Sequence, residues 1–203
     1  MKDVEEALRG AANELAEVPP ELGQAFAARA EQEGLVDVAY ASVDSPLGPL
    51  LAAATPAGLV TLSYEQFRPR DELLEGLAAK LSPRLIEAPG RLDEARRELE
   101  EYFEGRRERF ELPLDWSLTK GFARRVLEEA ARIAYGELRT YKDVATGAGS
   151  AGAVRAAGNA LGSNPMPIVV PCHRVVRTGG KLGGYTGGVE RKEFLLRLEG
   201  VQV

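Results

Sequence analysis

The chain has 203 residues, of which 44% are hydrophobic and 28% charged, so it can build a core and does not have the composition of a disordered protein. No apolar run approaches the roughly 18 residues of a membrane span, and the N-terminal residues lack the apolar core of a secretory signal. We therefore expect a cytoplasmic protein with no membrane partner. One cysteine and one histidine exclude an internal disulfide and a closed four-ligand zinc site. We expect neither a metal nor a cofactor.

Charge is distributed unevenly along the chain, although its net value is only −5. Residues 1–37 carry 3 basic and 9 acidic side chains, residues 38–115 carry 10 and 15, and residues 116–203 carry 13 and 7. Only the last third is basic. It predicts an anionic partner that docks on that third alone, with the acidic remainder facing away. The alternative is an ordinary fluctuation of composition.

The first 36 residues predict two amphipathic helices, the first stopped by Pro19-Pro20 and the second ending before Gly34. This acidic extension either packs on its own protein or docks a partner. From residue 38 onward, short apolar runs separated by turn residues predict an antiparallel meander of strands over 38–43, 50–54 and 59–64.

Two helices and a strand are expected after the meander. Leu73, Leu74 and Leu77 indicate the first helix, and an apolar stripe over 92–103 indicates the second. The run 110–114 predicts a final strand before a linker at Asp115.

The basic third predicts a helix-turn-helix. A long helix with an apolar stripe from Phe122 to Ile133 ends at Tyr135-Gly136. Thr140 then caps a short helix through Ala145. After a glycine-containing turn, Ser150 caps a further helix that runs to about Leu161. Such helical hairpins also occur in many enzymes.

The last of these helices has an unusually bare polar side. Residues such as Ala153 and Ala156 leave Arg155 as its one long basic side chain. Small side chains permit the close backbone approach that a narrow DNA groove requires, with one arginine able to insert. Packing against a neighbouring helix explains the same pattern equally well.

Cys172 follows the apolar run 168–170, which predicts a buried strand, and Pro171. The only histidine, His173, is adjacent, and Arg174 and Arg177 follow; positive surroundings favour the nucleophilic thiolate. The alternative is an inert, packed thiol. In an extended strand, neighbouring side chains point to opposite faces, so the imidazole would reach the thiol through a water. A carboxylate would orient the ring, but spacing does not identify which one.

Two glycine-containing segments follow the cysteine. Residues 177–181 predict a hairpin turn, a candidate wing beside the helix-turn-helix. Residues 183–188, Gly-Gly-Tyr-Thr-Gly-Gly, have the spacing of neither a P-loop nor a dinucleotide fingerprint. They are suited to wall a pocket, with Tyr185 as a stacking surface, before a helix that ends at Glu199-Gly200.

These residues carry a resemblance to a known family. Residues 164–175, Asn-Pro-Met-Pro-Ile-Val-Val-Pro-Cys-His-Arg-Val, resemble the active-site motif of the methylated-DNA–protein-cysteine methyltransferases, the O6-alkylguanine-DNA alkyltransferases. The likeness continues through the glycine-rich loop, Lys-Glu-Phe-Leu-Leu at 192–196 and Glu199-Gly200. Upstream it includes Tyr135-Gly-Glu, Thr140-Tyr141 and residues 153–158. It covers about 38–200, more loosely over the meander.

The resemblance implies an α/β (α+β) fold in two domains. Residues 37–115 would form a ribonuclease-H-like antiparallel sheet with helices. Residues 116–203 would form a winged helix-turn-helix domain that binds DNA and accepts the alkyl group. The acidic segment 1–36 lies outside the resemblance. The zinc site or cysteine-rich metal region of some relatives cannot exist with one cysteine and one histidine.

The resemblance also implies a role for each site residue. Cys172 accepts the alkyl group, His173 is the base through a water, Glu199 orients His173, Asn164 braces the turn and Tyr141 donates to the departing guanine. Arg155 enters the base stack in place of the flipped nucleotide. The remaining implied contacts are Tyr141, Ala153, Ala156 and Arg174 with DNA, and Tyr185, Thr186, Leu161 and Val175 with the base.

The implied function is direct reversal of O6-alkylguanine, and less well of O4-alkylthymine, in double-stranded DNA. A monomer would approach from the minor groove, flip the base and react once, irreversibly. Two other classes fit the residues without the resemblance. One is a winged-helix DNA-binding or regulatory module in which Cys172 is only packed, and the other is a cysteine hydrolase of a small substrate.

Overall fold

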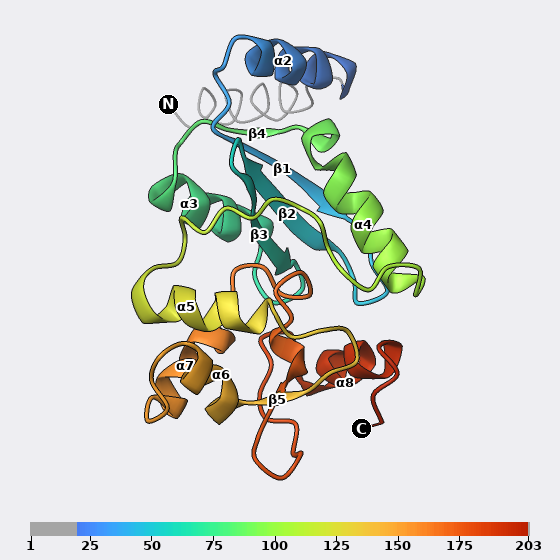
Figure 1. The fold of residues 1–203 in the computed structure, drawn as a ribbon. Helices are drawn as coiled ribbons and strands as arrows, with labels where there is room; N and C mark the ends of the chain where they lie inside the picture. Colours follow the sequence, from blue (N-terminus) through green and yellow to red (C-terminus); the bar gives the residue numbers. More distant parts are fainter. Residues whose placement is uncertain (1–19, 203) are drawn as a thin grey trace, which may run out of the picture. The chain divides into compact units, whose positions relative to one another are not determined.

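The computed structural model describes residues 20–202. Along the chain these belong to two compact units, the first ending at Val36 and the second beginning at Asp37. The first unit contains α2 (Pro20–Gln32), labelled in Figure 1. This is the second of the two predicted N-terminal helices, and it is confirmed. Proline is favoured at the first helical position because its missing N–H would have no partner there. The first predicted helix lies outside the described residues.

The second unit begins with the predicted meander. Strands β1 (Val38–Val43), β2 (Leu50–Thr55) and β3 (Gly58–Tyr64) pair antiparallel in chain order, so the prediction is confirmed. A short fourth strand, β4 (Leu85–Glu87), pairs in parallel with β1, which gives the order β3-β2-β1-β4. Sequence patterning did not predict β4, because three residues are too few to show a period.

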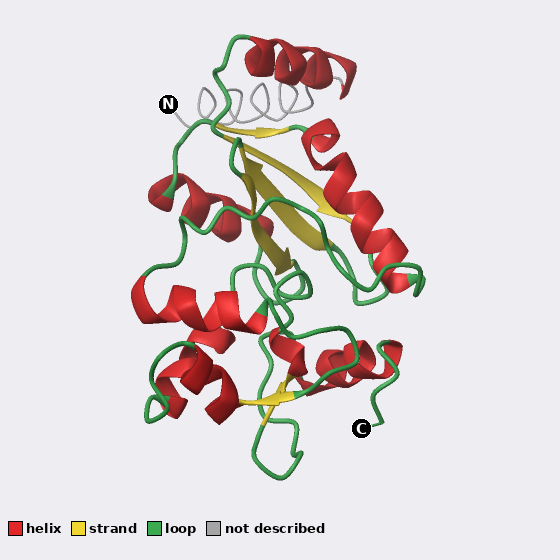
Figure 2. Ribbon diagram, in the orientation of Figure 1, coloured by secondary structure: helices red, strands yellow, loops and turns green. Residues whose placement is uncertain are grey.

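Helices cover both faces of this sheet (Figures 1 and 2). Leu77 of α3 (Arg70–Lys80) packs with Val38, Ala53 and Val60 on one face. The opposite face carries a larger core. It packs against α4 (Asp93–Phe103), which follows the short 3₁₀ turn η1 (Pro89–Leu92), and against the C-terminal elements. Alternate residues of a strand point to opposite faces, so β2 contributes Ala52 to one core and Ala53 to the other.

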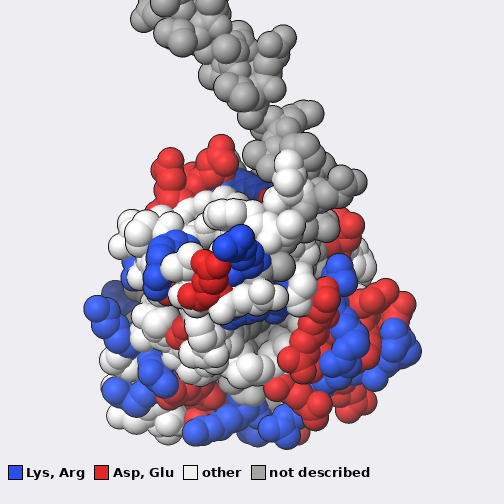
Figure 3. Space-filling model, turned by 90° about the horizontal axis from the view of Figure 1, so that it is seen from above, with Lys and Arg blue, Asp and Glu red and all other residues white. Residues whose placement is uncertain are grey.

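The outer face of α4 is densely charged, as the sequence indicated. Arg97 pairs with Glu101 at 3.2 Å, one turn along the helix. Arg107 also reaches Glu101, at 2.8 Å. On the face of the molecule seen in Figure 3, basic and acidic side chains lie next to one another, and uncharged residues separate these groups. No block of one sign covers that face.

The strand predicted over 110–114 is not formed. The segment makes a single isolated bridge, between Leu59 and Leu114. Pro113 has no backbone N–H to offer a ladder, although its carbonyl accepts from Leu59 N at 2.8 Å and Asp115 N donates to Leu59 O at 2.8 Å. The segment therefore lies beside β3 as an extended linker and not as a strand.

Three helices open the C-terminal part, in the arrangement predicted. They are α5 (Gly121–Ala130), α6 (Tyr141–Gly147) and α7 (Val154–Gly162), and α6 and α7 form the helix-turn-helix. Thr140 caps α6 in a full capping box with Asp143, which confirms that cap. The predicted end of the first helix was too late, because α5 stops at Ala130.

The predicted cap of the third helix was wrong. Helix α7 begins at Val154, and its N-cap residue is Ala153, which has no side-chain cap. Ser150 instead accepts a backbone bond from Ala153 N at 3.0 Å, so residues 150–153 form a turn of their own. A serine that can cap a helix can also begin a turn, and the sequence does not distinguish the two.

The expected buried strand over 168–170 is also absent. Val170 N donates to Met166 O at 2.8 Å, and Ile168 has a φ of +75°, so the segment is a compact turn. It leads into a 3₁₀ turn, η2 (Cys172–Arg174). Strand β6 (Val175–Val176) follows and pairs in parallel with β5 (Arg139–Thr140).

The predicted turn after β6 is confirmed. Arg177 N donates to Lys181 O at 2.8 Å, which closes the loop over 177–181. A glycine-rich stretch then leads to α8 (Val189–Leu198), the last helix, as expected.

Candidate active site

Cys172 opens the 3₁₀ turn η2 and is buried, with 5% of its surface exposed. The chain turns sharply here. The alternation of side chains along an extended strand, which argued against a simple pairing with His173, therefore does not apply. Cys172 is instead held by the turn that precedes it.

Asn164 ties that turn to the sulfur. Its Nδ2 donates to Val170 O at 2.8 Å and to Cys172 Sγ at 3.2 Å, while its Oδ1 accepts from Met166 N at 3.0 Å. One buried amide thus fixes both ends of the 166–170 turn and contacts the thiol. The expected bracing position of Asn164 agrees with this geometry.

The pKa of the Cys172 thiol is raised by burial to about 11, opposed by the Asn164 hydrogen bond and the charge of Lys192. The sequence had suggested that Arg174 and Arg177 make the surroundings positive and favour the thiolate. In the folded chain, burial outweighs the positive charge. Reaction at neutral pH therefore needs a base to remove the thiol proton.

Lys192 is a functional candidate that the sequence reasoning missed. It is fully buried, and its Nζ donates to Val175 O. Burial lowers the pKa of its ammonium to about 8. The available signal was its position three and four residues before Leu195 and Leu196, which places it on the apolar face of α8.

His173 lies entirely within the protein and pairs with the carboxylate that sequence spacing could not identify. Its Nε2 is 2.8 Å from Glu199 Oε1. Its Nδ1 is buried and has no hydrogen-bond partner in the described part of the chain. Burial lowers the pKa of His173, so the ring is neutral at pH 7.

Glu199 collects several donors in addition to His173. Tyr102 Oη donates at 2.7 Å, and Arg174 donates through Nε and Nη2, each at 2.9 Å. Burial alone would raise the pKa of Glu199, but the hydrogen bonds and charges of His173 and Arg174 together lower it to about 2. The carboxylate is therefore ionised and accepts a hydrogen bond from the N–H at His173 Nε2, which leaves the lone pair on Nδ1.

Arg174 was predicted to contact DNA, and the structure contradicts this. The residue is 5% exposed, and its guanidinium is engaged by Glu199 and by Ile133 O at 2.6 Å. A side chain held in this way cannot reach a phosphate. The 3₁₀ turn directs the Arg174 side chain inward, toward Glu199.

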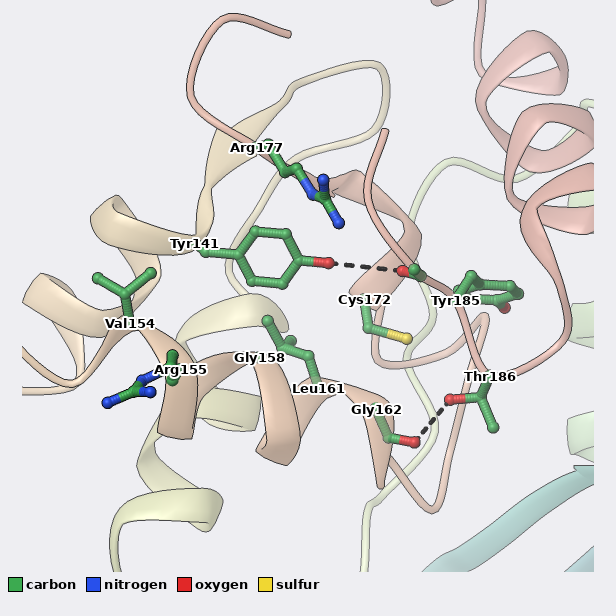
Figure 4. Close-up of a pocket in the computed structure, with 11 residues that line it drawn as sticks. Tyr141, Val154, Arg155, Gly158, Leu161, Gly162, Cys172, Arg177, Tyr185 and Thr186 are labelled. Atoms are coloured by element: carbon green, nitrogen blue, oxygen red, sulfur yellow. Dashed lines mark hydrogen bonds between the residues drawn. The ribbon is translucent and has the colours of Figure 1, made fainter. Parts of the chain in front are cut away.

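An open cavity of about 570 Å³ ends at Cys172 (Figure 4). Helix α7 forms one side of it and the glycine-rich loop the other. The predicted pocket residues Leu161, Tyr185 and Thr186 line it, as do Tyr141 and Arg155. Val175 does not line it and is fully buried, so that prediction was wrong.

The loop wall is fastened to both helices of the helix-turn-helix. Thr186 Oγ1 donates to Gly162 O at 2.8 Å at the end of α7. Tyr141 Oη donates to Gly184 O across a long 3.4 Å. Burial raises the pKa of Tyr141, so its phenol keeps its proton at neutral pH.

Arg155 stands at the rim of the cavity and is exposed. Its side chain points away from Cys172 (Figure 4), and it makes no ion pair with the residues that the structure describes. Ala156 is exposed beside it and Ala153 is half-buried. The surface of α7 next to the cavity therefore carries small side chains and one long basic side chain, that of Arg155.

Residues 20–202 show neither a cluster of metal-ligating side chains nor a membrane-spanning helix. No group of three His, Cys, Asp or Glu side chains there is placed to hold a metal ion. No helix in the same part of the chain has the length and apolarity needed to cross a membrane.

Known families match both halves of the second unit. The profile described as "6-O-methylguanine DNA methyltransferase, ribonuclease-like domain" matches residues 38–116. The profile described as "6-O-methylguanine DNA methyltransferase, DNA binding domain" matches residues 121–201.

Individual proteins match over nearly their whole length. The methylated-DNA–protein-cysteine methyltransferase of Methanosarcina barkeri is 41% identical over 160 residues, which cover 79% of this chain and 96% of that protein. A solved structure of the Mycobacterium tuberculosis O6-methylguanine methyltransferase is similar with a TM-score of 0.68 and 38% identity, over 80% of this chain and 92% of that one. The Mycobacterium tuberculosis OGT in complex with DNA also has a TM-score of 0.68 and 38% identity, over 79% and 92%.

Proposed function

Because the chain belongs to the O6-methylguanine-DNA methyltransferase family, we propose that its only cysteine, Cys172, is the residue that receives the alkyl group. The protein is a DNA repair enzyme that reverses alkylation directly by moving the group from DNA to its own cysteine. The observation that carries the assignment is the position of Cys172, which lines an open cavity and lies beside the His173–Glu199 pair.

We propose that His173 removes the thiol proton through one water molecule. Glu199 is ionised and holds the Nε2 proton, so Nδ1 is the basic nitrogen. The lowered pKa of His173 keeps that nitrogen unprotonated at pH 7. Glu199 thus orients the ring and stabilises the imidazolium that forms during transfer.

The bond changes are a single displacement. The sulfur of Cys172 forms a bond to the alkyl carbon as the bond from that carbon to guanine O6 breaks, and the electron pair leaves with the base. Tyr141 lies at the cavity with its proton in place and donates to the departing guanine. The thioether is stable, so each molecule acts once.

The helix-turn-helix is proposed to dock in the minor groove of double-stranded DNA. The small side chains of Ala153 and Ala156 would let the backbone of α7 come close to the DNA. The exposed Arg155 at the rim of the cavity could then insert into the base stack. Flipping a base costs a few kcal/mol, and an arginine in the vacated space offsets part of that cost. O4-alkylthymine is proposed as a weaker substrate.

The organisation proposed for the whole protein follows the sequence expectations. Residues 37–115 form the ribonuclease-like domain and residues 116–203 the winged helix-turn-helix domain that binds DNA and accepts the alkyl group. We propose that the protein acts as a monomer in the cytoplasm. The matched ranges 38–116 and 121–201 support the division.

Mass spectrometry of the intact protein tests the function. After incubation with a duplex containing O6-methylguanine, we expect one methyl group per molecule, located on Cys172, with no further turnover. Tight lesion binding without an adduct would favour a DNA-binding module that does no chemistry. Repeated turnover without an adduct would favour a hydrolase.

Cys172→Ala is the first variant to compare. Removing the sulfur should abolish transfer completely while leaving the dissociation constant for lesion-containing duplex within about threefold, because the DNA-facing surface of α7 is unchanged. Methyl transfer that persists in this variant would show that the acceptor is wrongly assigned.

A further inference from the structure

Tyr185 forms part of the cavity wall although it stands in a loop without regular secondary structure. The loop is bounded by Gly183 and Gly188, which have φ values of +72° and +87°. The bond from Gly188 N to Tyr185 O, at 3.0 Å, holds the backbone of Tyr185 but not its ring. The ring must be fixed by another group.

That group is Tyr64, at the end of β3. The two phenol oxygens lie 2.9 Å apart and are separated by 121 residues of sequence. Tyr64 is 3% exposed, and its ring meets that of Tyr185 edge to face, with centroids 6.4 Å apart. Burial raises the pKa of Tyr64 to about 12 and that of Tyr185 well above its ordinary value. Both phenols are therefore protonated at neutral pH, and the hydrogen bond between them persists.

Tyr64 is itself clamped by Arg191 of α8. The guanidinium lies 5.1 Å from the centre of the Tyr64 ring and 4.7 Å from that of Phe67. It also donates to Leu47 O at 3.2 Å and to Gly187 O at 3.0 Å. The sheet and the last helix thus hold the Tyr64 ring between them.

The residues around Tyr64 are tightly packed. A Cβ atom added at Gly187 would lie 2.8 Å from Cε2 of Tyr64 and 3.0 Å from Cε1 of Tyr185. The backbone of Gly187 therefore lies close against both tyrosine rings, with no room for a side chain between them. On its far side the Tyr185 ring meets His173 edge to face, with centroids 6.4 Å apart.

We propose that Tyr64 is a positioning residue for alkyl transfer, whose hydroxyl fixes the Tyr185 ring and so the wall against which the substrate base lies beside Cys172. The inference rests on the proposed function. It assigns the N-terminal sheet a part in the reaction beyond that of a scaffold, since the sheet sets the width of the cavity at its reactive end.

Tyr64→Phe tests this directly, because it removes one oxygen and keeps the ring under Arg191. The second-order rate constant of methyl transfer should fall about fivefold, the effect of one neutral hydrogen bond. The fall should be equal for a duplex containing O6-methylguanine and for the free base O6-methylguanine, since both use the same wall. The dissociation constant for undamaged duplex should not change.

Tyr40→Phe is the matched control. Tyr40 is a half-buried tyrosine of β1, in the same sheet, and its hydroxyl makes no hydrogen bond with the described residues. Its rate constants should equal those of the wild type. A Tyr64→Phe variant that behaves like Tyr40→Phe would overturn the proposal.

A double-variant cycle separates positioning from a general loss of stability. If the two hydroxyls act through one bond, Tyr64→Phe combined with Tyr185→Phe should react at the rate of Tyr185→Phe alone. Multiplied losses in the double variant would overturn the proposal. A wild-type protein that acquires no methyl on Cys172 would overturn the proposed function as well, whereas a reactive wild type with an unaffected Tyr64→Phe overturns only this inference.

Discussion

Glu199 is the side chain that joins the hydrogen bonds of the site, and the stability of the site depends on it. It accepts from Tyr102, His173 and Arg174, and more distantly from Gly136 N at 3.3 Å. An ionised carboxylate with this many donors is stable inside a protein, whereas an unpartnered one is not. The same ionised carboxylate that pairs with His173 therefore also holds the buried Arg174 in place.

Glu199→Gln should change the acid stability of the protein. The pKa of Glu199 in the folded state, about 2, lies below its ordinary value of 4.5. Its contribution is therefore complete above pH 4.5 and is lost as the pH falls toward 2, with a full span on the order of 3 kcal/mol. We expect the variant to be less stable than the wild type by about 3 kcal/mol at pH 7, with Arg174 unpaired.

Urea denaturation at pH 7, 4.5 and 3 measures this difference. The wild type should lose more of its unfolding free energy than Glu199→Gln between pH 4.5 and 3. Two parallel profiles over that interval would mean that the pKa of Glu199 is not lowered by folding.

Arg155→Ala should separate base flipping from chemistry. The side chain lies at the rim of the cavity and points away from Cys172, so its removal leaves the reacting groups untouched. We expect the rate of transfer from duplex O6-methylguanine to fall at least tenfold and the rate with the free base to stay within twofold. Stopped-flow quenching of both reactions measures the two constants. Equal losses on both substrates would exclude a role in flipping.

At the scale of single residues, the sequence predicted those site residues whose type occurs only once in the chain. Cys172 and His173 stood out because the chain has one cysteine and one histidine. The relative orientation of their side chains was not predictable, because the apolar run before them indicated a strand where the chain forms a 3₁₀ turn. Glu199 came only from the family resemblance, because 26 residues separate it from His173. Lys192 was missed, because a lysine in a helix with many charged residues is normally expected to be exposed. Its helical spacing from Leu195 and Leu196 would have placed it on the buried face.

The helix-turn-helix is the element proposed to dock on DNA, and the start of its first helix is set by local hydrogen bonds. Thr140 Oγ1 accepts from Asp143 N at 3.1 Å, while Thr140 N donates to Asp143 Oδ2 at 2.9 Å. Two of the otherwise unpaired donors at the helix start are thereby satisfied. Tyr141 follows the cap directly, so the cap also places the phenol at the cavity.

Thr140→Ala should lower the free energy of unfolding by about 1 kcal/mol. Thr146→Ala is its control in the same helix, because that hydroxyl only bonds back to Lys142 O at 2.7 Å on an exposed face. We expect this control to change stability by less than 0.5 kcal/mol. Urea midpoints of the two variants measure the contrast, and equal effects would show that the cap contributes nothing.

Strands were predictable where the pattern was long and free of proline. The meander of β1 to β3 has six or seven residues in each strand, between turns rich in proline and glycine. The run 110–114 looked similar but contains Pro113, whose missing N–H prevents a regular ladder. The stretch 168–170 is as apolar as a strand, yet the bonds of Asn164 fold it into a turn.

Over the whole molecule, the structure reduces the charge available to DNA. The last third has 13 basic and 7 acidic side chains. Arg174 and Lys192 are buried, as is Glu199, so 11 basic and 6 acidic side chains remain outside the core. The surplus at the surface is thus one charge smaller than the sequence suggests, and Arg155 is the basic side chain nearest the cavity on α7.

DNA affinity should fall with salt through release of counterions from the phosphates. For every two phosphates contacted, we expect the association constant to drop about tenfold between 50 and 200 mM salt. The rate with free O6-methylguanine should not change over the same range. Fluorescence anisotropy with a labelled duplex measures the first quantity, and a salt-independent affinity would contradict docking through the basic third.

The hydrogen bond from Tyr102 to Glu199 has a consequence for the order in which the protein folds. It joins residues 97 positions apart, and the Tyr64–Tyr185 bond joins residues 121 apart. Contacts so distant in sequence form late, because long loops must close first. These hydrogen-bonded pairs therefore form only when the N-terminal sheet and helix α4 have packed against the C-terminal elements. We expect a newly made or partly folded chain to lack both the His173–Glu199 pair and the cavity, so that it cannot take an alkyl group from a guanine base. A protein that can react only once therefore becomes able to repair DNA only after its whole fold, and not just the segment around its cysteine, is complete.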